Sequence, residues 1–186
     1  MKKFLLFVLS MVVTIGAKAT GEWSIDFAAL GANYDDKTAV TISETVATIG
    51  GTAMGTCTVS GDALNSNFVI QTGTSWLMRK SNGLYQSNGG GRSMGMLACT
   101  KGQIITIVGT GDPNPTTNAT LKSSSDKTYV YTVNDDGDVK FTPARYLYFT
   151  SITVENPSAS AVAYTVKYVD GEGNEIKTAT EGSAEP

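Results

Sequence analysis

The stretch that decides the fold class is residues 128–142, TYVYTVNDDGDVKFT. In residues 128–133 large apolar side chains recur at every second position, and side chains two apart in a strand share one face. The alternation stops at residues 134–137 and resumes with Val139 and Phe141. An Asp-Gly turn between two alternating segments is typical of an antiparallel β-hairpin, which we predict here.

The same pattern extends outward from this stretch. Short apolar segments alternate with clusters of Gly, Asn, Asp, Ser and Thr, and helical periodicity is nearly absent. The expected strands are residues 22–27, 40–42, 46–49, 56–59, 68–71, 75–78, 93–98, 103–108, 128–133, 138–142 and 146–154. About ten strands at this spacing predict an all-β domain over residues 20–156, an antiparallel β-sandwich of jelly-roll-like type, with an open barrel as the alternative.

The last of these strands contains a break in its alternation. In residues 146–154 the apolar positions include Phe149 and then resume one residue late, at Ile152. One extra residue in a strand explains such a slip, so we predict a β-bulge near Thr150 and Ser151.

The amino terminus has the features of a cleavable signal peptide. Lys2 and Lys3 precede an apolar run over residues 4–15, and Ala-Lys-Ala at 17–19 supplies the small residues of a cleavage site. The run is shorter than the ~20 apolar residues of a membrane span. We therefore expect residues 1–19 to be removed and the protein to be secreted or at the cell surface, on the extracellular or periplasmic side, with no remaining membrane span.

Charge and composition exclude several kinds of function. The formal charge is −3, and loss of residues 1–19 removes three lysines and changes it to −6, which argues against nucleic-acid binding. The chain contains no His, which excludes Ser-His-Asp and Cys-His nucleophilic sites and His-ligated zinc. The only cysteines, Cys57 and Cys99, form either one disulfide or two small buried hydrophobic residues.

The carboxyl-terminal part differs in composition from the rest. Residues 157–163 are small and polar and are predicted to be a linker. Residues 164–186 contain one β-hairpin, which is marginal by itself in water. We expect this segment to be the start of a further, truncated β domain of a longer protein.

Aromatic, basic and amide side chains are concentrated in residues 74–92, which we expect to form a flexible loop. Sugars stack on aromatic rings while Arg, Asn and Gln hydrogen-bond their hydroxyl groups. The alternative is that Trp76, which is followed by Leu77 and Met78, belongs to the core. The candidate ligand-binding residues are Trp76, Arg79, Tyr85, Asn88 and Arg92.

Three further motifs suggest specific chemistry. Carboxylates around the glycine of residues 134–138 suit calcium, although a plain hairpin turn explains them equally well. Asn118-Ala119-Thr120 fits the glycosylation acceptor pattern and predicts a surface loop. Arg145 with a tyrosine would allow an acid–base lyase mechanism, but the only ground for it is that these residues are present. We expect no metal, no cofactor and no catalytic residue.

Several of these segments resemble a known class of module. The chain resembles the accessory carbohydrate-binding-module-like β-sandwiches of large secreted bacterial polysaccharide-degrading proteins. The segments that carry the resemblance are residues 76–79, 83–85, 91–92, 101–107, 136–141 and 145–155. The resemblance covers most of residues 20–156 and implies a pectin-lyase-like or glycoside hydrolase domain in the same chain. Residues 164–177 are similar to the opening hairpin of mucin-binding-type repeats of bacterial surface proteins.

These observations give three hypotheses about function. The first is a secreted, non-catalytic module that binds polysaccharide and targets an attached enzyme to it. The second is a structural or adhesive spacer of a bacterial surface protein. The third, a polysaccharide lyase or hydrolase, has the least support because no spacing of residues selects a catalytic pair.

Overall fold

The computed structural model describes residues 21–86, 92–143 and 147–157, together with the backbone of residues 164–169 and 175–181. The predicted signal peptide, most of the predicted linker, Asn88 and Arg145 lie outside this part. The part of the chain that the structure describes is all-β, with 57% strand and 4% helix. Among the described residues no helix is long and apolar enough to cross a membrane.

The elements follow one another along the chain with short connections, as the turn-rich sequence predicts. They are β1 (Trp23–Asp26), α1 (Phe27–Gly31), β2 (Thr38–Ile42), β3 (Ala47–Ile49), β4 (Thr52–Val59), β5 (Asp62–Ala63), β6 (Phe68–Gln71), β7 (Trp76–Arg79), β8 (Gly83–Gln86), β9 (Met94–Cys99), β10 (Ile104–Gly109), β11 (Thr116–Thr117), β12 (Ala119–Ser125), β13 (Thr128–Val133), β14 (Gly137–Phe141), β15 (Tyr148–Glu155), β16 (Tyr164–Val169) and β17 (Glu175–Glu181).

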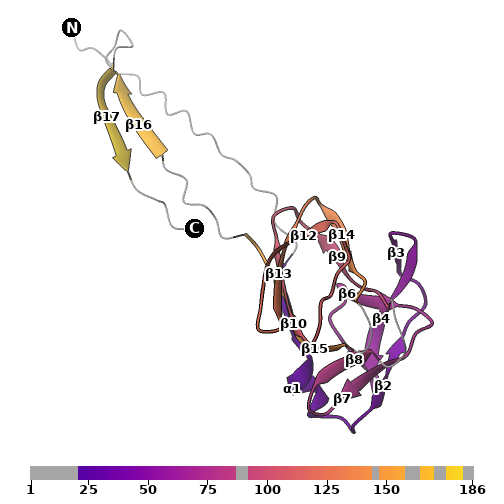
Figure 1. Cartoon of the computed structure of the whole chain (residues 1–186). Helices are drawn as coiled ribbons and strands as arrows, with labels where there is room; N and C mark the ends of the chain where they lie inside the picture. Colours follow the sequence, from indigo (N-terminus) through magenta and orange to yellow (C-terminus); the bar gives the residue numbers. More distant parts are fainter. Residues whose placement is uncertain (1–20, 87–91, 144–146, 158–163, 170–174, 182–186) are drawn as a thin grey trace. The chain divides into compact units, whose positions relative to one another are not determined.

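Fifteen of the strands form one antiparallel sheet that curls until it is nearly closed into a barrel (Figure 1). Twelve of them follow the order β11-β14-β9-β6-β4-β2-β7-β8-β15-β10-β13-β12, while β1 pairs with β15, and β3 and β5 each pair with β4. The two terminal strands of this order, β11 and β12, are consecutive in the chain, with only Asn118 between them. Asn118 has a φ of 63°, in the left-handed region. At this bend the chain leaves β11, which pairs with β14 at one end of the sheet, and enters β12, which pairs with β13 at the other end.

The hairpin predicted over residues 128–142 is wrong in its pairing. Both strands exist close to their expected bounds, as β13 and β14. However, β13 pairs with β10 and β12, whereas β14 pairs with β9 and β11. The Asp-Gly segment therefore forms a corner between opposite ends of the sheet rather than a two-stranded turn. Alternation in each strand reports a buried face, but it does not identify the neighbouring strand.

The predicted β-bulge in β15 is confirmed. In the ladder with β10, Ser151 pairs with Val108 and Phe149 pairs with Gly109, so Thr150 is the extra residue. Phe149 and Ile152 are both fully buried on the two sides of this shift. The first part of β15 pairs with β8 and the second part with β1.

The interior is filled by one large apolar cluster, to which most strands contribute. Its largest fully buried side chains are Trp76, Tyr131, Phe27, Phe68, Phe141 and Phe149. The cluster is closely packed at Gly83, whose φ is 79°. A Cβ at this position would meet the carbonyl oxygen of Phe149 and would lie 2.9 Å from Cβ of Phe27. Helix α1, capped by the Asp26 side chain, lies beside this point and buries Phe27 against β8 and β15 (Figure 1).

Strands β16 and β17 form a separate two-stranded antiparallel sheet, which confirms the hairpin predicted in this region. Its register runs from Tyr164 opposite Glu181 to Val169 opposite Glu175, with an irregularity between Tyr168 and Val169. The turn that joins the two strands lies outside the described residues.

Candidate ligand-binding surface

Much of the stretch expected to be a flexible loop is an ordered hairpin of β7 and β8. Trp76 pairs with Gln86, and Arg79 pairs with Gly83. Because side chains alternate across a strand, the hairpin sends Trp76 into the core and sends Arg79 and Tyr85 to the outer face. The predicted site residues are therefore divided between the two faces of one sheet.

Trp76 belongs to the core, as the alternative interpretation of the sequence proposed. Its side chain is 1% exposed and contacts the ring of Phe149, with ring centroids 6.3 Å apart. A saccharide needs an exposed ring face for stacking, and Trp76 has none. Trp76 therefore contributes to packing and presents no ring face to a ligand in this structure.

Tyr85 and Arg79 do come together, and two residues from elsewhere in the chain join them. Tyr85 lies opposite Tyr148 of β15 in the ladder, and their rings stack with centroids 4.6 Å apart. The guanidinium of Arg79 lies over the Tyr85 ring, 5.6 Å from its centroid. Arg79 Nε also donates to Asp36 Oδ1 at 2.9 Å. We call Asp36, Arg79, Tyr85 and Tyr148 the tyrosine platform.

The charges of the platform fix its geometry. The hydrogen bond from Arg79, together with one from the backbone N–H of Lys80, lowers the pKa of Asp36 below its ordinary value. The hydrogen bond to Asp36 likewise raises the pKa of Arg79. Both groups therefore stay charged around neutral pH, and Asp36 holds the guanidinium plane beside the ring of Tyr85. This pre-organises the platform before any ligand arrives.

A hollow of about 350 Å³ lies next to the platform, and Tyr148 lines it. Its other walls include Asn82 in the β7–β8 turn, Lys127 in the β12–β13 turn, and Thr150. We call this the β15 hollow. With Asp126, which also lines it, the hollow combines an aromatic ring, an amide, an ammonium, a carboxylate and hydroxyl groups, which are groups that hold the faces and hydroxyls of a sugar.

Of the two remaining predicted residues, Asn88 lies outside the described residues, and Arg92 is half-buried just before β9. Sequence reasoning missed Tyr148, although the alternation of β15 carries a usable signal. Leu147 and Phe149 on its two sides are buried, so Tyr148 has to face outward. No sequence signal marks Asp36, which reaches Arg79 across 43 positions of the chain.

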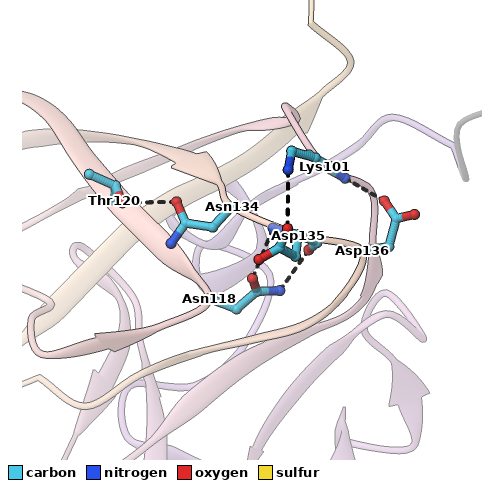
Figure 2. A network of polar contacts seen from close by, with 6 residues as sticks. All are labelled: Lys101, Asn118, Thr120, Asn134, Asp135 and Asp136. Atoms are coloured by element: carbon cyan, nitrogen blue, oxygen red, sulfur yellow. Dashed lines mark hydrogen bonds and ion pairs between the residues drawn. The ribbon is translucent and has the colours of Figure 1, made fainter.

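The acidic turn considered for calcium is occupied by protein hydrogen-bond donors (Figure 2). Lys101 Nζ contacts Asp135 Oδ1 at 3.1 Å, and the backbone N–H of Lys101 donates to Asp136 Oδ1 at 2.7 Å. Asp138 Oδ1 accepts from the backbone N–H of Ala98 at 2.9 Å. These carboxylates point to separate donors rather than to a common centre. No group of three or more acidic or cysteine side chains suited to a metal occurs in the described part of the chain.

Asn118, the candidate glycosylation acceptor, uses its side chain within the same network (Figure 2). Its Nδ2, the atom that would carry a glycan, donates to the carbonyl oxygens of Asp135 and Asp138 at 2.8 and 3.4 Å. A glycan would replace one of the two hydrogens of this nitrogen, so at least one of these contacts would be lost. Asn118 therefore has a structural role at the junction of β11 and β12.

Cys57 and Cys99 are free and buried, so the structure has the thiol alternative rather than the disulfide. Burial raises the pKa of each thiol to about 12, with a contribution from Asp138 at Cys99. Thiols with such pKa values are poor nucleophiles at neutral pH. They do not form a reactive site.

Comparisons with protein families, curated proteins and solved structures found no match. The tyrosine platform and the β15 hollow therefore have to be interpreted from their geometry alone.

Proposed function

We propose that the domain formed by residues 21–157 is a non-catalytic module that binds polysaccharide at the tyrosine platform and targets an attached enzyme to it. The observation that carries the proposal is the stacked pair Tyr85–Tyr148, held by Arg79 and adjoining the β15 hollow. Under this proposal the protein is secreted or located at the cell surface, on the extracellular or periplasmic side.

The binding mode follows from the position of Tyr148. One face of its ring is covered by Tyr85, and the residue also lines the hollow. A sugar ring in the hollow would stack its C–H face on Tyr148 while Asn82 and Lys127 hydrogen-bond its hydroxyl groups. The hollow is only partly enclosed, so a polymer chain could enter it along the outer face of the sheet. The finer architecture that we propose for this domain is a flattened, jelly-roll-like sandwich with this surface on its outer face.

The second candidate function is a structural or adhesive spacer of a surface protein. It is favoured by β16 and β17, which form a two-stranded sheet of their own beyond the main sheet. A lyase or hydrolase is the third candidate, and no cluster in the described residues favours it. Asp36 of the platform and Asp135 and Asp136 of the acidic turn are already bonded to Arg79, to Lys101 and to backbone donors.

Affinity electrophoresis in gels that contain neutral polysaccharides tests the proposal. We expect at least one polysaccharide to retard the full chain and Tyr148→Ala to abolish the retardation, because the substitution removes the stacking surface. Tyr34→Ala is the matched control, since Tyr34 is a half-buried tyrosine in a different hollow. Circular dichroism of both variants establishes that they are folded.

Two results would count against polysaccharide binding at the tyrosine platform. If no polysaccharide in a broad panel retards the chain, the spacer function is favoured. If Tyr148→Ala migrates like the unmodified protein in a gel that does retard it, binding occurs elsewhere on the surface. Release of reducing ends by the purified chain would instead revive the enzyme hypothesis.

A further inference from the structure

A second hollow, of about 550 Å³, lies between β1, helix α1 and the segment that follows β5. Its apolar lining consists of Ile25, Leu30 and Leu64, all of which belong to or pack against the main core. Tyr34 crosses from one wall to the other, because its hydroxyl group donates to Asp62 Oδ2 at 3.3 Å. We call this the Tyr34 hollow.

The charges that line the Tyr34 hollow have one sign. Asp26 and Asp62 are both exposed there, and no Lys or Arg side chain is among its described lining residues. Each carboxylate uses one oxygen in a hydrogen bond found in the described part of the chain. Asp26 Oδ1 accepts from the N–H of Ala29 at 2.8 Å, and Asp62 Oδ2 accepts from Tyr34. Among the described residues no hydrogen bond to the second oxygen of either carboxylate is found, so a hydrogen-bond donor entering the hollow would meet an acceptor.

We propose that the Tyr34 hollow binds a primary ammonium group carried on a short stem, such as that of an amino sugar or a lysine side chain. Asp26 and Asp62 supply the counter-charge, and charge-assisted hydrogen bonds to a carboxylate are stronger than neutral ones. The Tyr34 ring favours a cation at its face. Leu30 and Leu64 cover the stem, since such ligands bury their carbon chains while the charged end stays near water.

This site is separate in chemistry from the tyrosine platform. The tyrosine platform pairs the guanidinium of Arg79 with the carboxylate of Asp36, and the β15 hollow beside it is lined by both Lys127 and Asp126. The Tyr34 hollow is lined by two carboxylates and by no described Lys or Arg side chain. It therefore favours a ligand with a positive charge, and the inference does not depend on polysaccharide binding at the platform.

Titrations of the ¹⁵N-labelled full chain, followed by amide chemical shifts, test the proposal. The probes are glucosamine and Nα-acetyl-lysine methylamide, each compared with its N-acetylated, uncharged counterpart. We expect the charged probe of at least one pair to shift the amides of Leu64 and Asn65, and its neutral counterpart to leave them in place. The pair that responds distinguishes a saccharide stem from an aliphatic one.

Two substitutions with the same charge change sharpen the test. Asp62→Asn should weaken binding by about tenfold or more, the change expected from losing a hydrogen bond to a charged group. Asp35→Asn, next to Tyr34 in the chain but outside the lining, should leave the affinity within about twofold. Equal shifts with charged and neutral probes, no shift with either charged probe, or unchanged affinity in Asp62→Asn would each overturn the proposal. Retardation by neutral polysaccharide is a separate readout, so failure here leaves the platform untouched.

Discussion

The side-chain amide of Asn118 hydrogen-bonds both backbone groups of Asp135, accepting from its N–H at 3.0 Å and donating to its carbonyl oxygen at 2.8 Å. Since Asn118 is the single residue between β11 and β12, these bonds attach the point where the two ends of the sheet meet to the β13–β14 corner. The Asn118 side chain thereby connects the two ends of the sheet, β11 and β12, which do not pair with each other.

Asn118→Gly should therefore lower the free energy of unfolding by about 1–3 kcal/mol, because it removes these hydrogen bonds and keeps the left-handed backbone available. Asn118→Ala should cost about 1 kcal/mol more, since alanine tolerates a φ of 63° poorly. Urea unfolding measures both values. Equal midpoints for the two variants and the unmodified protein would show that the network contributes nothing.

Trp76→Phe should lower the melting temperature and leave polysaccharide retardation intact. The indole is 1% exposed, and no hydrogen bond to its Nε1 is found among the described residues, so phenylalanine loses volume but no polar contact. Trp76→Ala, by contrast, should cost about 3–5 kcal/mol. The measurement is affinity electrophoresis of Trp76→Phe at a temperature where circular dichroism shows it folded. Loss of retardation there would return Trp76 to the binding site.

Gly83→Ala should destabilise the protein much more than Gly61→Ala. Both glycines have a positive φ, 79° and 90°, so both substitutions incur the left-handed penalty of about 1–2 kcal/mol. A Cβ at Gly61 meets open space, whereas one at Gly83 meets Phe149 and Phe27, which should add about 1–3 kcal/mol. Chemical denaturation of the pair isolates the packing term. Equal decreases in the free energy of unfolding would mean that α1 and β8 can move apart to accept the Cβ without loss of stability.

The free energy of unfolding should fall as the pH rises above about 8.5, where an unfolded thiol ionises. Cys57 and Cys99 remain neutral in the folded protein up to a pKa of about 12. Their stabilising contribution is therefore complete below pH 8.5 and is lost between there and pH 12, by up to about 1.4 kcal/mol per pH unit for each thiol. Urea unfolding at pH 8 and pH 10 measures the fall.

The double variant Cys57→Ala with Cys99→Ala is the control and should show a smaller fall. A thiol reagent provides the independent count, since two thiols should react after unfolding without reductant and neither should react quickly before it. No reaction after unfolding would show that the cysteines are paired.

The sequence was most informative about which face of a single strand is buried. The alternation in residues 128–133 and the slip at Thr150 predict β13 and the bulge of β15 correctly, because both depend on burial within a single strand. The sequence did not predict features that depend on which strands or residues lie next to each other in the fold. Strand β12 is almost wholly exposed, and β11 has only two residues, so neither has a hydrophobic pattern to detect. The pairing of β14 with β9 and the contact of Asp36 with Arg79 are long-range, and no local pattern encodes them.

The bulge at Thr150 has a consequence for how this surface would tolerate insertions and deletions. Deletion of Thr150 would restore strict alternation and place Phe149 two positions before Ile152, so both would still face the core and Tyr148 would stay on the outer face. If the strand instead kept Thr150 but paired without a bulge, Phe149 would turn toward solvent and Tyr148 toward the interior. A single-residue deletion should thus preserve the stacked pair, whereas loss of the bulge alone would dismantle it. The bulge therefore sets which aromatic ring the outer surface displays.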